Sequence, residues 1–165
     1  MAAGATYTPI ATTTGDGSSQ SITFNSFSGY TDLILVTNAI NTGGTKNIGI
    51  QFNGDTGTNY SRTALTYDLG SVTSNRNSGQ SAITTTSDGI SSTGPSTHII
   101  HIMNYSNTTT YKTVLMRNGN ASYGTDVEVG LWRSTAAITS FTYYFTGAGA
   151  WSTSSTFTLY GIAAA

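Results

Sequence analysis

The sequence contains no cysteine, so disulfide bonds and thiolate metal sites are excluded. Charged residues are also scarce: they make up 8% of the 165 residues, against roughly a quarter in an average globular domain. No stretch approaches the roughly 20 apolar residues of a membrane-spanning helix, and residues 1–4 lack the basic and apolar regions of a signal peptide. We therefore expect no membrane anchor, and synthesis in the cytoplasm without processing.

The charges that are present nearly cancel, with six Lys and Arg residues against seven Asp and Glu residues. This balance is too small to attract nucleic acid or an anionic membrane, so we expect neither as a partner. Aromatic residues make up 11% of the chain, which is more than a disordered chain usually contains. The length fits one folded domain over residues 1–165, with a short N-terminal arm and a short C-terminal tail.

Short runs of β-branched and aromatic residues recur along the chain and predict strands. The alternation is clear at Ile48, Ile50 and Phe52, which would share one face of a strand. No segment shows a helical period of 3.6 residues. The predicted strands cover residues 7–12, 20–24, 32–40, 47–52, 60–67, 81–86, 97–105, 111–116, 127–132, 138–146 and 156–162.

Turn signals rich in Gly, Asn and Asp separate these runs, as at residues 53–55 and 118–120. About ten short strands joined in this way predict an all-β protein, namely an antiparallel β-sandwich with a jelly-roll-like arrangement. The least regular stretch runs from about Gly70 to Gly94, where we expect a long loop or an insertion at one end of the sandwich. The core is predicted from strands 32–40 and 138–146.

Two carboxylates deserve a chemical interpretation. Asp126 and Glu128 would share one face of a predicted strand, which would suit calcium binding or acid/base chemistry on a glycosidic bond. The simpler interpretation, which we favour, is a solvated strand face near Arg133 or Arg117. No enzymatic role is therefore predicted from this pair.

Other candidate sites are weak. His98 and His101 lie three residues apart in a predicted strand, so their side chains should point to opposite faces, which disfavours a joint metal site. No Gly-x-Ser-x-Gly elbow is present, and the Gly-rich turns lack both the phosphate-loop lysine and a full set of acidic calcium ligands. We predict no enzyme, no cofactor and no metal.

Tyrosine and tryptophan are the more informative residues, because they bury a large area in an interface at low entropic cost and their rings also stack on sugars. Packing in the sandwich core is the alternative for about half of them. The interface candidates are Tyr105, Tyr123, Trp132, Tyr144 and Trp151.

Several runs share a pattern that covers most of the chain outside the irregular stretch. They are YTDLILV (30–36), FNGDTGTNYS (52–61), IMNYSNTTTYKTVL (102–115), RNGNA (117–121), VGLWRSTAAI (129–138) and STFTLYGI (155–162). Together these runs resemble a module of virion structural proteins from tailed bacteriophages, especially marine and cyanobacterial ones. The resemblance implies a structural protein without a catalytic motif, either free-standing or at the end of a tail fibre.

The absence of a recognisable shaft or attachment segment favours a free-standing protein. We expect a capsid decoration or cement protein, made in the host cytoplasm and placed on the outer surface of the phage particle, where it stabilises the head through contacts between subunits. Its expected partners are the major capsid protein or other virion proteins and further copies of itself, as a homotrimer. The alternative is a tail-fibre or tail-tip component that binds a host glycan, with residues 70–94 as the recognition loop.

Overall fold

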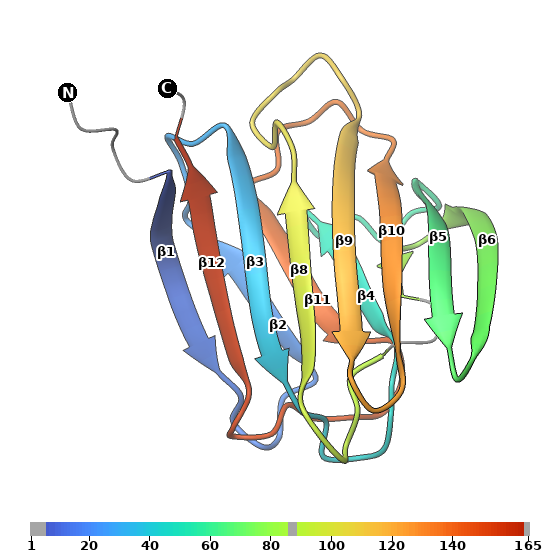
Figure 1. The fold of residues 1–165 in the computed structure, drawn as a ribbon. Helices are drawn as coiled ribbons and strands as arrows, with labels where there is room; N and C mark the ends of the chain where they lie inside the picture. The colour runs from blue at the N-terminus through green and yellow to red at the C-terminus, as the bar shows by residue number, and fades with distance from the viewer. Residues whose placement is uncertain (1–5, 86–88, 164–165) are drawn as a thin grey trace.

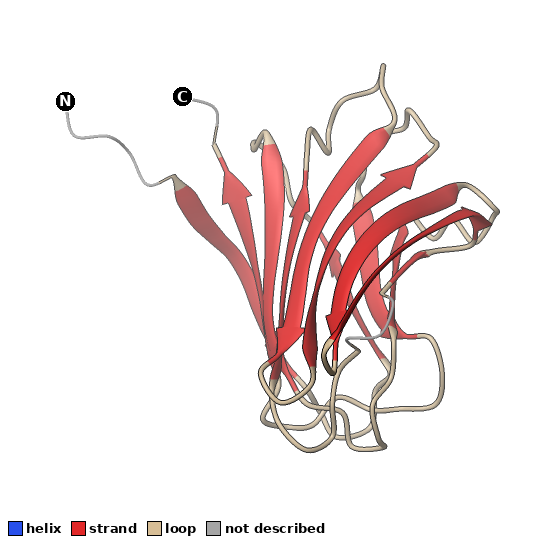
Figure 2. Ribbon diagram, turned by 45° about the vertical axis from the view of Figure 1, so that its right-hand side comes forward, coloured by secondary structure: helices blue, strands red, loops and turns tan. Residues whose placement is uncertain are grey.

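The structure is a computed structural model and describes residues 6–85 and 89–163. Within these ranges the chain forms strands and loops without a helix, which confirms the predicted all-β class (Figure 2). The expected N-terminal arm and C-terminal tail fall mostly outside the described residues. The described strands are β1 (Tyr7–Thr14), β2 (Ser21–Asn25), β3 (Asp32–Ala39), β4 (Ile48–Phe52), β5 (Tyr60–Asp68), β6 (Ser71–Gln80), β7 (Ile83–Thr84), β8 (Ser96–Ile102), β9 (Lys112–Asn120), β10 (Gly124–Trp132), β11 (Ser140–Phe145) and β12 (Thr156–Ile162).

The strands form two antiparallel sheets that pack face to face as a β-sandwich. The larger sheet has eight strands in the order β1-β12-β3-β8-β9-β10-β5-β6, and the smaller has four in the order β2-β11-β4-β7. In Figure 1 the larger sheet lies in front, with β2, β4 and β11 behind it. When the hairpins β5–β6 and β9–β10 are set aside, the remaining orders are β1-β12-β3-β8 and β2-β11-β4-β7, which is the strand order of a jelly roll.

The irregular stretch after Gly70 is a strand in its first half, so the expectation of a long loop is wrong there. β6 pairs with β5 along its length through a two-residue turn at Leu69 and Gly70, both with positive φ, as a tight hairpin requires. The side chains of β6 are nearly all polar and exposed, so no apolar alternation marks the strand in the sequence. The hairpin is an insertion into the jelly roll and extends the larger sheet at one edge.

The hydrophobic core lies between the two sheets and includes the strands predicted to form it. Leu33 and Leu35 of β3 are fully buried, as is Tyr143 of β11. The loop residue Trp151 closes one end of the core, since its ring stacks on Phe145 with centroids 3.9 Å apart and on Tyr143 at 5.3 Å. Stacked aromatic rings stabilise this end of the core, in a chain that has no disulfide bond.

Candidate functional site

Three of the five aromatic residues expected at an interface belong to the core instead. Tyr105, Trp132 and Trp151 are at most 3% exposed, so the prediction that their side chains reach the surface is wrong. The reason is that their rings pack against core aromatic residues from other parts of the chain. Trp132 lies on the inner face of β10, where its ring is 5.5 Å from that of Phe52, and Tyr105 makes an edge contact with Phe27.

The remaining two candidates differ from each other. Tyr144 is half-buried on the smaller sheet, and its ring covers Gly49 so closely that a Cβ there would lie 2.6 Å from it. Burial raises the pKa of the Tyr144 hydroxyl. Tyr123, in the turn between β9 and β10, is 40% exposed and is the one candidate of the five whose ring is largely available to a partner.

The two carboxylates of β10 lie inside the sandwich, so the interpretation of a solvated strand face is wrong. Asp126 and Glu128 are both 0% exposed. Glu128 is paired with Arg62 of β5, with Nη1 and Oε2 3.8 Å apart, and its Oε1 accepts a 3.3 Å hydrogen bond from Nδ2 of Asn118. Burial of a charge is tolerated only with such partners.

The arginines expected beside these carboxylates lie elsewhere. Arg133 donates hydrogen bonds from Nη2 to the carbonyl oxygens of Thr58 and Tyr60, and Arg117 is exposed on the opposite face of the sheet. In residues 6–85 and 89–163, no three His, Asp or Glu side chains are grouped closely enough to hold a metal ion.

The two histidines of β8 point to opposite faces, as their spacing predicts. His98 is fully buried, and its Nδ1 lies 2.8 Å from the hydroxyl of Tyr143. His101 lies on the other face, with Nε2 2.8 Å from Oδ2 of Asp32. Each ring is held by a partner from a different strand, and the two imidazoles do not form one site.

The most unusual surface is the face of the larger sheet that is turned away from the smaller sheet, here called the outer face and seen from the front in Figure 1. In most sandwiches such a face is polar because water covers it. Here the strand register places apolar side chains next to each other across seven strands. They include Tyr160, Ile34, Val36, Ile99, Leu115, Val127, Val129, Leu65, Tyr67 and Val72. The most exposed of them lie on β10, β5 and β6, whereas Ile34 is buried by its neighbours.

Threonines fill much of the remaining outer face, and formal charges are few. Within the described part of the chain, the register assigns this face Asp32 on β3, Arg117 on β9 and Arg76 on β6. The apolar outer face was not predicted from the sequence. The signal was present in β10, where Thr125, Val127 and Val129 alternate with the two carboxylates, but alternation alone does not say which set faces water.

The fold and this surface define a β-sandwich whose larger sheet carries apolar side chains on both faces. A search of protein-family models, curated proteins and solved structures finds no match to the chain. Across the described residues there is no helix long and apolar enough to cross a membrane. The function is therefore inferred from the residues themselves.

Proposed function

We propose that this protein is a non-enzymatic structural protein of a phage virion, a capsid decoration or cement protein whose outer face packs on neighbouring subunits. The observation that carries the proposal is the orientation of β10, which turns Val127 and Val129 outward, each 48% exposed, while Glu128 is buried. Contiguous exposed apolar side chains of this kind mark surfaces that a partner covers.

The electrostatic character of the outer face supports an assembly role. Burying a charge in an interface requires a well-placed partner, and this face presents few charges that must be desolvated. The net charge of −1 also limits repulsion between crowded copies. In this proposal the partners are the major capsid protein or other virion proteins together with further copies of the chain, and a homotrimer is the proposed oligomer.

The size of the outer face fits a stable contact. Eight strands about 4.8 Å apart, each about 23 Å long for seven residues, form a face of roughly 800 Å². One partner contributes about 800 Å² to a protein interface of standard size. A neighbour that covers most of the outer face would therefore be held specifically.

The test is to locate the protein on purified phage particles and to disrupt the outer face. We expect antibody label on the head, in a copy number comparable with that of the major capsid protein. Val127→Lys and Leu65→Lys should abolish binding of the purified protein to undecorated heads, because each would bury a lysine charge in the contact. Tyr111→Lys, which alters an exposed ring in the loop between β8 and β9, is the matched control and should bind normally.

Two results would contradict the proposal, the first its location on the head and the second its contact surface. Label confined to the tail would replace it with the tail-fibre or tail-tip alternative. Equal binding by the outer-face variants and the Tyr111→Lys control, with unchanged thermal unfolding, would show that the outer face is not the contact surface.

A further inference from the structure

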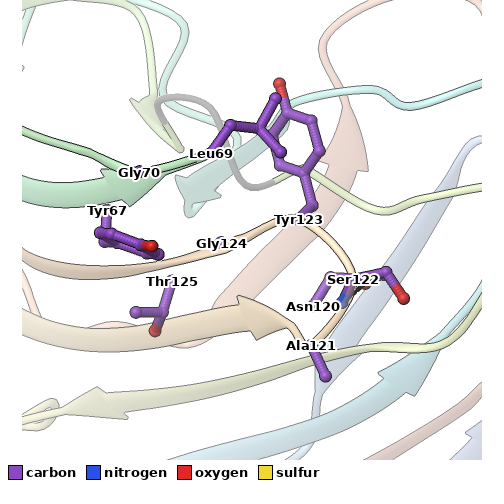
Figure 3. A pocket seen from close by; sticks show the side chains of 9 residues that line it. All are labelled: Tyr67, Leu69, Gly70, Asn120, Ala121, Ser122, Tyr123, Gly124 and Thr125. Atoms are coloured by element: carbon purple, nitrogen blue, oxygen red, sulfur yellow. Dashed lines mark hydrogen bonds between the residues drawn. The ribbon is translucent and has the colours of Figure 1, made fainter.

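A groove runs along the end of the sandwich where the hairpin turns lie. Its main part is an open hollow of about 590 Å³ between the β5–β6 turn and the β9–β10 turn (Figure 3). This part is lined by Tyr67, Leu69, Gly70 and residues 120–125. A second hollow of about 100 Å³ shares Asn120, Ser122 and Tyr123 with the first and extends it to Thr45, Ser91 and Thr93. We call the two together the turn groove.

The lining of the turn groove has the chemistry of a sugar site. Two tyrosine rings, those of Tyr67 and Tyr123, are 47% and 40% exposed there, and Figure 3 shows them on either side of Gly124. Ser122 and Thr125 add hydroxyl groups to the lining, and the hydroxyl of Thr125 donates a 2.8 Å hydrogen bond to the carbonyl oxygen of Asn118. Among the residues that the structure describes, none that lines either hollow is charged. Aromatic faces that pack on C–H groups, with neutral hydroxyls around them, suit an uncharged polyol better than an ion.

The groove is held in shape before any ligand arrives. Asn120 fixes the β9–β10 turn to the neighbouring loop, since its Nδ2 donates to the carbonyl oxygen of Pro95 at 3.3 Å and to Oγ of Ser96 at 3.2 Å. Its Oδ1 accepts a 2.9 Å bond from the backbone N–H of Ser122. The backbone N–H of Leu69 donates to the carbonyl oxygen of Tyr123 at 3.4 Å, which joins the two turns. A preformed site loses less entropy on binding.

The backbone conformation at position 69 disfavours leucine, so the fold by itself does not explain this residue. Its φ is +46°, a left-handed conformation that Gly, Asn or Asp adopt more readily, and its side chain is 72% exposed. Strained residues of this kind concentrate where a side chain contacts a ligand. Here the leucine forms an apolar wall of the groove beside Tyr123.

We propose that the turn groove binds a neutral, linear oligosaccharide, with Tyr67 and Tyr123 as stacking surfaces and Asn120 as a positioning residue. This role goes beyond the proposed virion function, and because Tyr67 and Thr125 lie at the edge of the outer face as well as in the groove, it is tested on the free chain. The absence of charge in the lining makes uronic or sialic acid chains the poorer ligands, because a carboxylate would lose water without gaining a counter-charge.

The experiment is a titration of the purified full chain with maltohexaose, cellohexaose and xylohexaose, and in parallel with hexagalacturonate. We expect binding to at least one neutral hexasaccharide and none to the acidic one. Tyr67→Ala and Tyr123→Ala should each weaken binding about tenfold, the loss that corresponds to one aromatic contact. Tyr123→Phe keeps the ring and should retain most of the affinity. Tyr111→Ala, which removes a ring that is 54% exposed away from the groove, should bind as the native chain does.

The proposal is overturned if no neutral hexasaccharide binds, if hexagalacturonate binds as well as the neutral chains, or if Tyr111→Ala weakens binding as much as Tyr123→Ala. Thermal unfolding of every variant shows whether a loss of binding is a loss of fold. A chain that binds no sugar but still decorates phage heads would overturn this inference and leave the proposed function intact.

Discussion

The indole Nε1 of Trp132 donates a 2.7 Å hydrogen bond to Oδ2 of Asp55, which ties the end of β10 to the loop between β4 and β5. Nδ2 of Asn59 donates to the same oxygen at 2.9 Å, and the backbone N–H of Gly57 donates to Oδ1 at 2.8 Å. The bond from Trp132 is the largest cause that lowers the pKa of Asp55 from its ordinary value of 3.8. The carboxylate is therefore a structural acceptor.

Acid should weaken the fold through Asp55. Because its pKa is lower in the folded chain, the ionised carboxylate stabilises the fold above about pH 4, and this contribution is lost as pH falls through the folded pKa. Asp55→Ala should lower the free energy of unfolding by about 1–3 kcal/mol at neutral pH, since the buried indole N–H loses its acceptor. Urea unfolding between about pH 2 and about pH 7 tests this. An unchanged acid profile in Asp55→Ala would contradict the assignment.

Alkali should weaken the fold through two buried tyrosines. Burial raises the pKa of Tyr60 to about 12 and raises that of Tyr143 further above its ordinary value of 10.0. The unfolded chain ionises first, so the stabilising contribution is present below pH 10.0 and is lost as pH rises through the folded pKa values. Urea unfolding at increasing pH, with phenolate absorbance followed in parallel, is the measurement. Tyr60→Phe should lose less stability over this range than the native chain.

Thr85 is a buried acceptor and should not tolerate loss of its hydroxyl. It is 3% exposed, and its Oγ1 accepts a 3.0 Å hydrogen bond from the backbone N–H of Ile48. Thr85→Ala should cost about 1–3 kcal/mol of unfolding free energy, because that N–H is left without an acceptor. Thr85→Ser, which keeps the hydroxyl, should retain most of the native unfolding free energy.

The matched controls for Thr85 come from a surface threonine and a core leucine. Thr73→Ala changes an exposed residue of β6 and should alter stability by under about 0.5 kcal/mol. Leu35→Ala should cost about 2–5 kcal/mol by opening a cavity in the core. Chemical denaturation of all four variants gives the comparison, and equal effects of Thr85→Ala and Thr73→Ala would contradict the role of the hydroxyl.

The ion pair between Arg62 and Glu128 should be strongly coupled. Their side chains are 6% and 0% exposed, so removal of either one leaves a buried charge without this partner. Glu128→Ala and Arg62→Ala should each cost about 3–5 kcal/mol of unfolding free energy. The double variant should cost less than the sum of the two.

Arg117→Ala is the control for the ion pair, since it removes an exposed arginine from a neighbouring strand and should change stability by under about 0.5 kcal/mol. Denaturant unfolding of the double-mutant cycle measures the coupling. Strict additivity would show that the two side chains do not stabilise each other.

The edge strand β6 should be the least stable part of the larger sheet. It pairs with β5 alone, and its side chains make few buried contacts. Native-state hydrogen exchange should therefore show faster exchange in β6 than in β3 or β8, which are bonded on both sides. Equal protection in β6 and β8 would indicate that another surface covers this edge.

The alternation of β10 was visible in the sequence, but the direction of its two faces was not. An apolar-inside rule would place Val127 inside and Glu128 outside. The structure does the opposite, because Gly130 and Trp132 share the inner face with the carboxylates. Trp132 fills the core, and Ile83 lies so close to Gly130 that a Cβ would be 2.7 Å from it. These tertiary contacts outweigh the burial preference of Val127 and Val129.

The turn groove could not be predicted from the sequence either, because the residues that line it come from distant parts of the chain. The pairing of β10 with β5 places Thr125 opposite Tyr67, and the turns that follow then bring Leu69 beside Tyr123. The aromatic candidates chosen from the sequence included Tyr123 but not Tyr67, since composition does not distinguish a core ring from a surface ring.

By itself the sequence determined the all-β class, most strand positions, the scarcity of charge and the absence of thiols. These depend on composition and on spacing between residues that are close in the chain. Only the tertiary structure decided the strand order, the inward position of Asp126 and Glu128, the strand β6 and the residues that form the outer face and the turn groove. All of these depend on pairing between residues far apart in the chain, and a shift of one residue in that pairing would exchange the two faces of a strand.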